Sequence, residues 1–188
     1  MWAILGLTLG LAGIVSRHKA QSRPVTLAKP VLVGDLMIRL PEKWHFSIIP
    51  SEDGTAVRGR EPASENDRSV RAMVISDERL GKAAVDAEEY LSNNILNAGV
   101  HTQPIKFSGL HRDGVVAEID KLDEEDSSEG AGAPGLYACA VVSLPDGQAL
   151  AVVVTVEDIP PFSAGDRELL RQVVDAITLS PGAGSRTP

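Results

Sequence analysis

The stretch LYACAVVSLPDGQALAVVVTV, residues 136–156, decides the fold. It contains two nearly continuous apolar runs, Leu136–Leu144 and Ala149–Val156, and the turn sequence Pro145-Asp146-Gly147 between them. Two strands joined by a short turn form an antiparallel hairpin. A strand that is apolar on both sides is covered on both of its faces. We therefore expect this hairpin at the centre of an antiparallel sheet that is covered above and below.

Shorter segments on both sides of the hairpin alternate between apolar and polar residues. Such alternation with a period of two predicts strands that are buried on one face. The strands predicted in this way lie at 36–40, 44–48, 70–74, 104–108 and 115–120, with a weaker one at 55–60. The pair Asp113-Gly114 favours a turn between the last two of the alternating segments.

Two segments change to helical spacing. Apolar residues recur at this spacing over 84–98, where Asp86 and Glu89 form a variant of the capping box. A second amphipathic helix is expected from Asp166, its predicted cap, to about Thr178. The order of strands, helix, strands and helix predicts an α+β fold. We expect an antiparallel sheet of six or seven strands with helices on both faces, a three-layer α/β/α sandwich, preceded by an N-terminal apolar helix.

The N-terminal segment from Trp2 to Val15 contains no charged residue. As a helix it would span roughly 21 Å, which is short for a membrane span and suits the core of a signal peptide. No basic residue precedes the segment, whereas Arg17, Lys19 and Arg23 follow it, so the positive-inside rule favours a domain that faces the cytoplasm. We expect a membrane location through this single segment, as an uncleaved signal anchor. A cleaved signal peptide and an extracytoplasmic domain are the alternatives.

Length and composition fit one folded domain. Of the 188 residues, we assign 1–19 to the anchor or signal segment, 20–31 to a linker, 32–180 to the domain and 181–188 to a disordered tail. The formal net charge of −8 repels phosphate backbones, so nucleic-acid binding is not expected. The single cysteine, Cys139, lies in an apolar run and is expected to be a buried hydrophobe rather than a reactive thiol.

No motif has the spacing that catalytic or cofactor chemistry needs. The pattern G-x-G-x-x-G at 130–135 matches a dinucleotide-binding sequence by letter, but it opens a predicted strand instead of a helix. The four histidines lack the spacing of metal ligands. Asp120, Asp123, Glu124 and Asp126 are candidates to hold Ca²⁺ weakly, because hard cations prefer carboxylate oxygens. A solvated acidic loop is the simpler interpretation of these residues, and we expect no cofactor.

Three segments carry a resemblance to a known family. They are Leu-Pro-Glu-Lys-Trp at 40–44, Asp-Ala-Glu-Glu-Tyr-Leu at 86–91 and Val-Val-Asp-Ala-Ile-Thr-Leu at 173–179. In this order they resemble the PsbP-like superfamily, which includes the extrinsic PsbP protein of photosystem II, a Ran-binding nuclear import factor and bacterial members of unknown role. The resemblance covers about residues 32–180 and rests on fold markers. It implies a non-enzymatic domain that docks on a larger assembly, and it transfers no functional residue.

Three functions are compatible with these features. The first is a membrane-tethered, non-enzymatic interaction or assembly module that holds a protein partner through a sheet edge, the acidic loop or the loop at 61–68. The second is a carrier of a small apolar ligand, which needs an open apolar pocket. The third is an enzyme with an unrecognised site, which needs titratable residues that converge in a cleft. We expect the first function, and therefore no enzymatic activity.

Overall fold

A computed structural model describes residues 25–51, 54–62, 68–76, 80, 86–96, 101–120, 134–144 and 147–183. The strands in these residues are β1 (Val31–Val33), β2 (Leu36–Ile38), β3 (His45–Ser51), β4 (Gly54–Arg60), β5 (Ser69–Ser76), β6 (Thr102–Phe107), β7 (Arg112–Ile119), β8 (Gly135–Ser143), β9 (Ala149–Glu157) and β10 (Thr178–Leu179). The helical elements are α3 (Ala87–Tyr90), the π-helical η2 (Leu91–Leu96), the 3₁₀ turn η3 (Ser108–Leu110) and α4 (Ala164–Asp175).

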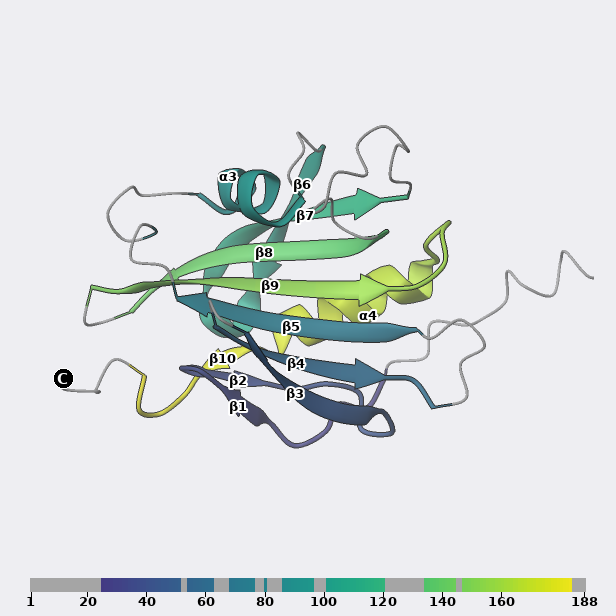
Figure 1. The fold of residues 1–188 in the computed structure, drawn as a ribbon, viewed down its shortest axis with the longest axis horizontal. Coiled ribbons are helices and arrows are strands. Elements are labelled where there is room, and N and C mark those ends of the chain that lie inside the picture. The colour runs from purple at the N-terminus through teal and green to yellow at the C-terminus, as the bar shows by residue number, and fades with distance from the viewer. Residues whose placement is uncertain are drawn as a thin grey trace, which may run out of the picture.

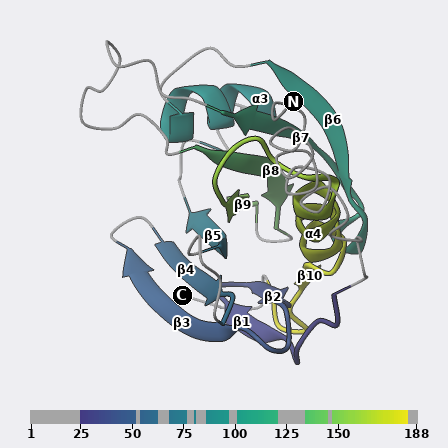
Figure 2. The ribbon, with the colours of Figure 1, turned by 90° about the vertical axis from the view of Figure 1, so that its right-hand side faces the viewer.

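The strands form two sheets (Figure 1). The large sheet has the order β3-β4-β5-β9-β8-β7-β6, and every neighbouring pair is antiparallel. The small sheet has the order β1-β2-β10 and is also antiparallel. The large sheet curls around α4, with β3 and β6 at the two ends of the arc (Figure 2). We call the side that encloses α4 the concave face and the side that carries α3 the convex face.

The predicted central hairpin is confirmed. β8 and β9 pair from Leu136↔Val156 to Ser143↔Ala149. Almost every residue of both strands is buried, as expected for strands covered on each side. Of the predicted turn, the described residue is Gly147, whose N–H donates to the Leu144 carbonyl at 3.0 Å. Gly147 has a φ of +85°, a conformation that glycine adopts without strain.

Alternation along these strands divides the core between the two faces. On the concave face, Val152 and Val154 pack in one cluster with Leu169, Leu170 and Val173 of α4. The convex face supplies a second cluster, in which side chains of β8 and β9 contact α3 and η2; this cluster includes Tyr137, Cys139, Ala151, Val153, Tyr90, Leu91 and Leu96. The expectation that Cys139 is buried is confirmed, since none of its surface is exposed.

The expected fold class, an α+β three-layer α/β/α sandwich behind an N-terminal apolar helix, is wrong. The described chain is mainly β, with 50% of its residues in strands and 21% in helices. Of the predicted helix over 84–98, the described residues form the four-residue α3 and the six-residue π-helical η2. The predicted strand at 36–40 lies outside the large sheet, because β2 pairs with β1 and β10. The strands therefore form two sheets, and α3 and α4 are short.

Two local predictions also need correction. Asp113-Gly114 does not form the turn between β6 and β7; that turn is η3, and Gly114 lies inside β7. A Cβ on Gly114 would lie 2.3 Å from the Cys139 carbonyl oxygen, so close approach of two strands explains this glycine. The cap of α4 is Ser163 instead of Asp166, which is the third helical residue and completes a capping box.

The predicted membrane location through a single N-terminal signal anchor is also contradicted. In the described parts of the chain, no helix combines the length and the apolar character that crossing a membrane requires. The residues on which the prediction rested, Trp2 to Val15 with Arg17, Lys19 and Arg23, lie outside the described residues. The transmembrane helix is therefore dropped from the account of this chain.

Candidate interaction surface

β3 forms one outer edge of the large sheet, and its apolar side chains are exposed. It pairs with β4 from His45↔Arg60 to Ser51↔Gly54, and no other strand in the described part of the chain pairs with it. Ile48 is 60% exposed and Phe46 is 42% exposed. An outer strand directs alternate backbone N–H and C=O groups away from its sheet. β3 therefore presents unpaired backbone groups beside exposed apolar side chains.

The sequence before β3 fixes its position against β4. The N–H of Trp44 donates to the Pro41 carbonyl at 3.1 Å, which closes the turn that leads into β3. Trp44 itself is buried. A Cβ on Gly59 of β4 would lie 3.4 Å from the Trp44 ring and 3.6 Å from the Phe46 ring, so both rings pack over this glycine. Phe46 is thereby anchored on one side while its other side stays open.

The opposite edge of the sheet, β6, has a different character. Pro104 lies in the middle of β6, is exposed, and has no N–H to offer an incoming strand. Lys106 is exposed two residues later. Proline and lysine on an outer strand are features that prevent edge-to-edge pairing. Of the two edges of the large sheet, β3 is the one that can accept another strand.

The convex face next to β3 carries a network of polar side chains. The Ser69 hydroxyl, which is fully buried, donates to the Glu157 carboxylate at 2.7 Å. The Nε and Nη2 atoms of Arg58 lie 3.2 Å and 3.1 Å from the same hydroxyl, and Arg58 also pairs with Glu157. The ion pair between Arg58 and Glu157, together with the Ser69 hydroxyl that contacts both of its members, thus connects β4, β5 and β9.

Two further arginines on this face have no carboxylate partner among the described residues. Arg60 is exposed at the end of β4, and Arg71 is half-buried on β5 opposite Arg58. The Nη2 atom of Arg71 lies 3.7 Å from the Met73 sulfur, and no group in the described residues accepts a hydrogen bond from its buried Nε atom. The convex surface of β4 and β5 is therefore positively charged in a chain whose net charge is −8.

Two protons on the convex face are held firmly. Burial and, to a smaller extent, the Glu157 carboxylate raise the pKa of the Tyr137 hydroxyl to about 12, although Arg71 opposes this shift. Burial also raises the pKa of the Cys139 thiol to about 12. A thiol that stays protonated at neutral pH is a poor nucleophile. Neither group is suited to start covalent chemistry.

An ionic cluster closes the end of the sheet near the start of α4. The Arg68 guanidinium pairs with Asp166, lies 3.5 Å from Asp158, and lies 5.9 Å from the centre of the Trp44 ring. The Asp166 carboxylate also accepts hydrogen bonds from the Ser163 N–H at 2.8 Å and hydroxyl at 2.6 Å. Because these charges are already paired, the cluster connects strands to helix and is not a candidate for catalysis.

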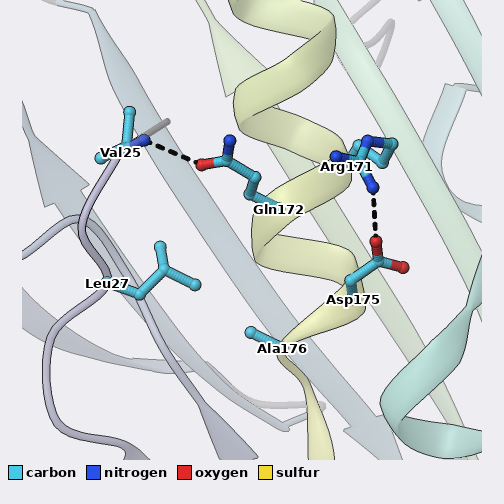
Figure 3. A pocket seen from close by; sticks show the side chains of 6 residues that line it. All are labelled: Val25, Leu27, Arg171, Gln172, Asp175 and Ala176. Atoms are coloured by element: carbon cyan, nitrogen blue, oxygen red, sulfur yellow. Dashed lines mark hydrogen bonds and ion pairs between the residues drawn. The ribbon is translucent and has the colours of Figure 1, made fainter. Parts of the chain in front are cut away.

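A shallow groove of about 390 Å³ lies between α4 and the segment before β1 (Figure 3). Val25 and Leu27 form one side and α4 the other, and the Val25 N–H donates to the Gln172 side chain at 3.0 Å. Arg171 and Asp175 on the α4 side form an ion pair of 2.9 Å. The apolar side chains of Val25, Leu27 and Ala176 share the lining with this ion pair and an amide, and the groove is open to solvent, so it does not provide the enclosure that a lipid-like ligand needs.

The residues predicted as candidate ligands are not assembled into a site. Asp120 is exposed at the end of β7, whereas Asp123, Glu124 and Asp126 lie outside the described residues, as does most of the G-x-G-x-x-G pattern. His45 is exposed at the start of β3. Within the described ranges, no three histidine, cysteine or acidic side chains are close enough to hold a metal ion.

Sequence reasoning missed the open edge at β3. The alternation over 44–48 predicted one buried face, and for Trp44 this is correct. It could not show that Phe46 and Ile48, which lie on the same face as Trp44, are not covered by α4 and the small sheet. The available signal was indirect, namely that Pro104 and Lys106 protect the other edge.

No protein-family model matches the chain, and no curated protein is significantly similar to it.

Proposed function

We propose that this chain is a non-enzymatic interaction module that binds a partner protein by accepting one of its extended segments as an additional strand on β3. The observation that carries the proposal is the exposure of Phe46 and Ile48 on an unpaired strand. The resemblance to the PsbP-like superfamily, which implies a docking domain, supports the same interpretation.

Strand addition combines two sources of binding energy. Hydrogen bonds between main chains supply affinity, and side-chain contacts at alternate positions supply specificity. Pro50 cannot donate a hydrogen bond, so the usable part of β3 is His45–Ile49. Phe46 and Ile48 point to the same side of this segment and would cover apolar side chains of the incoming strand.

The two alternative functions have less support. A carrier of an apolar ligand needs an enclosed apolar cavity, and the groove beside α4 is open and carries an ion pair. An enzyme needs titratable groups that converge in a cleft. The clustered charges that the structure describes, such as Arg68 with Asp166, are paired with one another instead.

The proposal is tested by photo-crosslinking in the native cells. A photoreactive residue replaces Ile48 in one full-length variant and Ile159 in another, because these two isoleucines are almost equally exposed, at 60% and 62%. We expect the first variant to crosslink one partner through a short extended peptide, which mass spectrometry of the product identifies. The second variant should not crosslink that partner.

The substitution Ile48→Lys provides the functional control. A charge on an outer strand blocks pairing, so we expect at least a tenfold loss of partner binding while Ile159→Lys binds normally. Full binding by Ile48→Lys would contradict the proposal. Light scattering on the purified chain tests the other possible occupant: a dimer that Ile48→Lys disperses would show that β3 pairs with a second copy, which would also contradict it.

A further inference from the structure

We infer that the segment accepted by β3 is an acidic amphipathic strand, with carboxylates at alternate positions facing the convex side and apolar residues facing the concave side. This inference rests on the proposed function. Its new content is the chemical class of the partner, which follows from the two different surfaces that β3 and its neighbours present.

The register of β3 and β4 determines which side chains share a face. His45 is opposite Arg60, and Ser47 is opposite Arg58, so these four side chains lie on the convex face. Phe46 and Ile48 lie on the concave side. A strand that adds to β3 continues this alternation, because side chains of neighbouring strands point the same way at paired positions.

The charges on the convex side favour carboxylates. β3, β4 and β5 contain no aspartate or glutamate, yet they contain Arg58, Arg60 and Arg71. Arg58 is already paired with Glu157, whereas no residue that the structure describes forms an ion pair with Arg60 or Arg71. Three adjacent strands without an acidic residue therefore form a positive surface on a protein with a net charge of −8. Such a surface attracts an anionic segment and repels a basic one.

Arg60 is the arginine that can contact the added strand. It is exposed, and neighbouring strands are about 4.8 Å apart, so only the width of β3 separates it from the incoming backbone. His45 lies directly opposite Arg60 on β3, and the diagonal neighbour Ser47 is small, so the long Arg60 side chain can lean across β3 on the Ser47 side. A glutamate on the added strand can then reach the Arg60 guanidinium from the other side.

The test uses two synthetic nine-residue peptides and the full-length chain. One peptide alternates glutamate with valine, and the other alternates lysine with valine. We expect the glutamate peptide to bind about tenfold more tightly in fluorescence anisotropy at low salt, with a difference that decreases as salt increases. Arg60→Glu should reduce binding of the glutamate peptide about three- to tenfold, while Arg112→Glu, an exposed arginine at the start of β7, should not.

The outcomes separate the inference from the proposed function. If both peptides bind equally and Ile48→Lys prevents the binding of both, strand addition stands and the acidic preference is refuted. If neither peptide binds, or if Ile48→Lys leaves binding intact, both proposals fail. If the glutamate peptide binds with the preference described but Arg60→Glu does not change it, the role of Arg60 is wrong and the inference is overturned.

Discussion

At the scale of single residues, loss of the Arg68 side chain should be costly. It pairs with Asp166, a carboxylate that is only 5% exposed. Removing one member of a buried pair leaves the other charge uncompensated, which costs about 3–5 kcal/mol. We therefore expect Arg68→Ala to lower the free energy of unfolding by about 3 kcal/mol in urea denaturation. Arg167→Ala, which removes an exposed pair with Glu118, should cost less than about 1 kcal/mol.

Cys139 should make the chain sensitive to alkali. Its pKa is raised from 9.0 to about 12 in the folded protein, so the unfolded chain loses this proton at a lower pH. The protonated thiol therefore makes its full contribution to the free energy of unfolding below pH 9. This contribution decreases as the pH rises towards 12. By pH 10.5 we expect a loss of about 2 kcal/mol relative to pH 8.

The measurement is urea denaturation of the wild type and of Cys139→Ala at both values of pH. Part of the decrease should persist in the variant, because burial and Glu157 also raise the pKa of Tyr137. An identical pH dependence in the two proteins would contradict the assignment of this effect to Cys139.

At the scale of elements, the start of α4 depends on a capping box. The Ser163 hydroxyl accepts from the Asp166 N–H, and the Asp166 carboxylate accepts from the Ser163 N–H. Loss of a serine cap costs about 1 kcal/mol. Ser163→Ala should therefore lower the free energy of unfolding by about this amount, while Ser163→Thr, which keeps the hydroxyl that also donates to Asp166, should restore much of it. If Ser163→Ala were neutral in thermal denaturation, the capping box would not stabilise α4.

The pairing of β7 with β8 depends on Gly114. A Cβ at this position would lie 2.3 Å from the Cys139 carbonyl oxygen and 2.8 Å from the Phe107 ring. Neither backbone nor buried ring can move away cheaply, so Gly114→Ala should cost about 4 kcal/mol or more. The expected result is loss of the cooperative thermal transition. Gly165→Ala is the matched control, because its Cβ would lie 3.4 Å from a single hydroxyl.

Elements were predictable from the sequence where a local pattern determines them. The hairpin of β8 and β9 followed from two apolar runs and a turn, and Asp86 caps α3 as its spacing with Glu89 indicated. Gly114 was misinterpreted because the sequence does not distinguish a glycine that a turn requires from a glycine that the close approach of a neighbouring strand requires. A local sequence pattern cannot predict contact with a strand that is distant in the sequence.

At the scale of the whole molecule, the sequence could not show how the strands are divided between sheets. β2 alternates in the same way as β3, yet it pairs with β1 and β10 beneath the large sheet. The choice of partner strand is decided by tertiary packing, and so is the amount of cover that each face receives. For this reason the three-layer sandwich was an incorrect expectation, and the exposed edge at β3 became visible only in the structure.

The central claim is that β3 is the edge at which this molecule accepts an acidic strand. Amide hydrogen exchange of the full-length chain, with and without the alternating glutamate–valine peptide, tests it most directly. The account predicts slower exchange in His45–Ile49 when the peptide is present, and unchanged exchange in β6, where Pro104 interrupts the edge. Protection that appears in β6, or that leaves His45–Ile49 unchanged while the peptide is bound, would contradict the account.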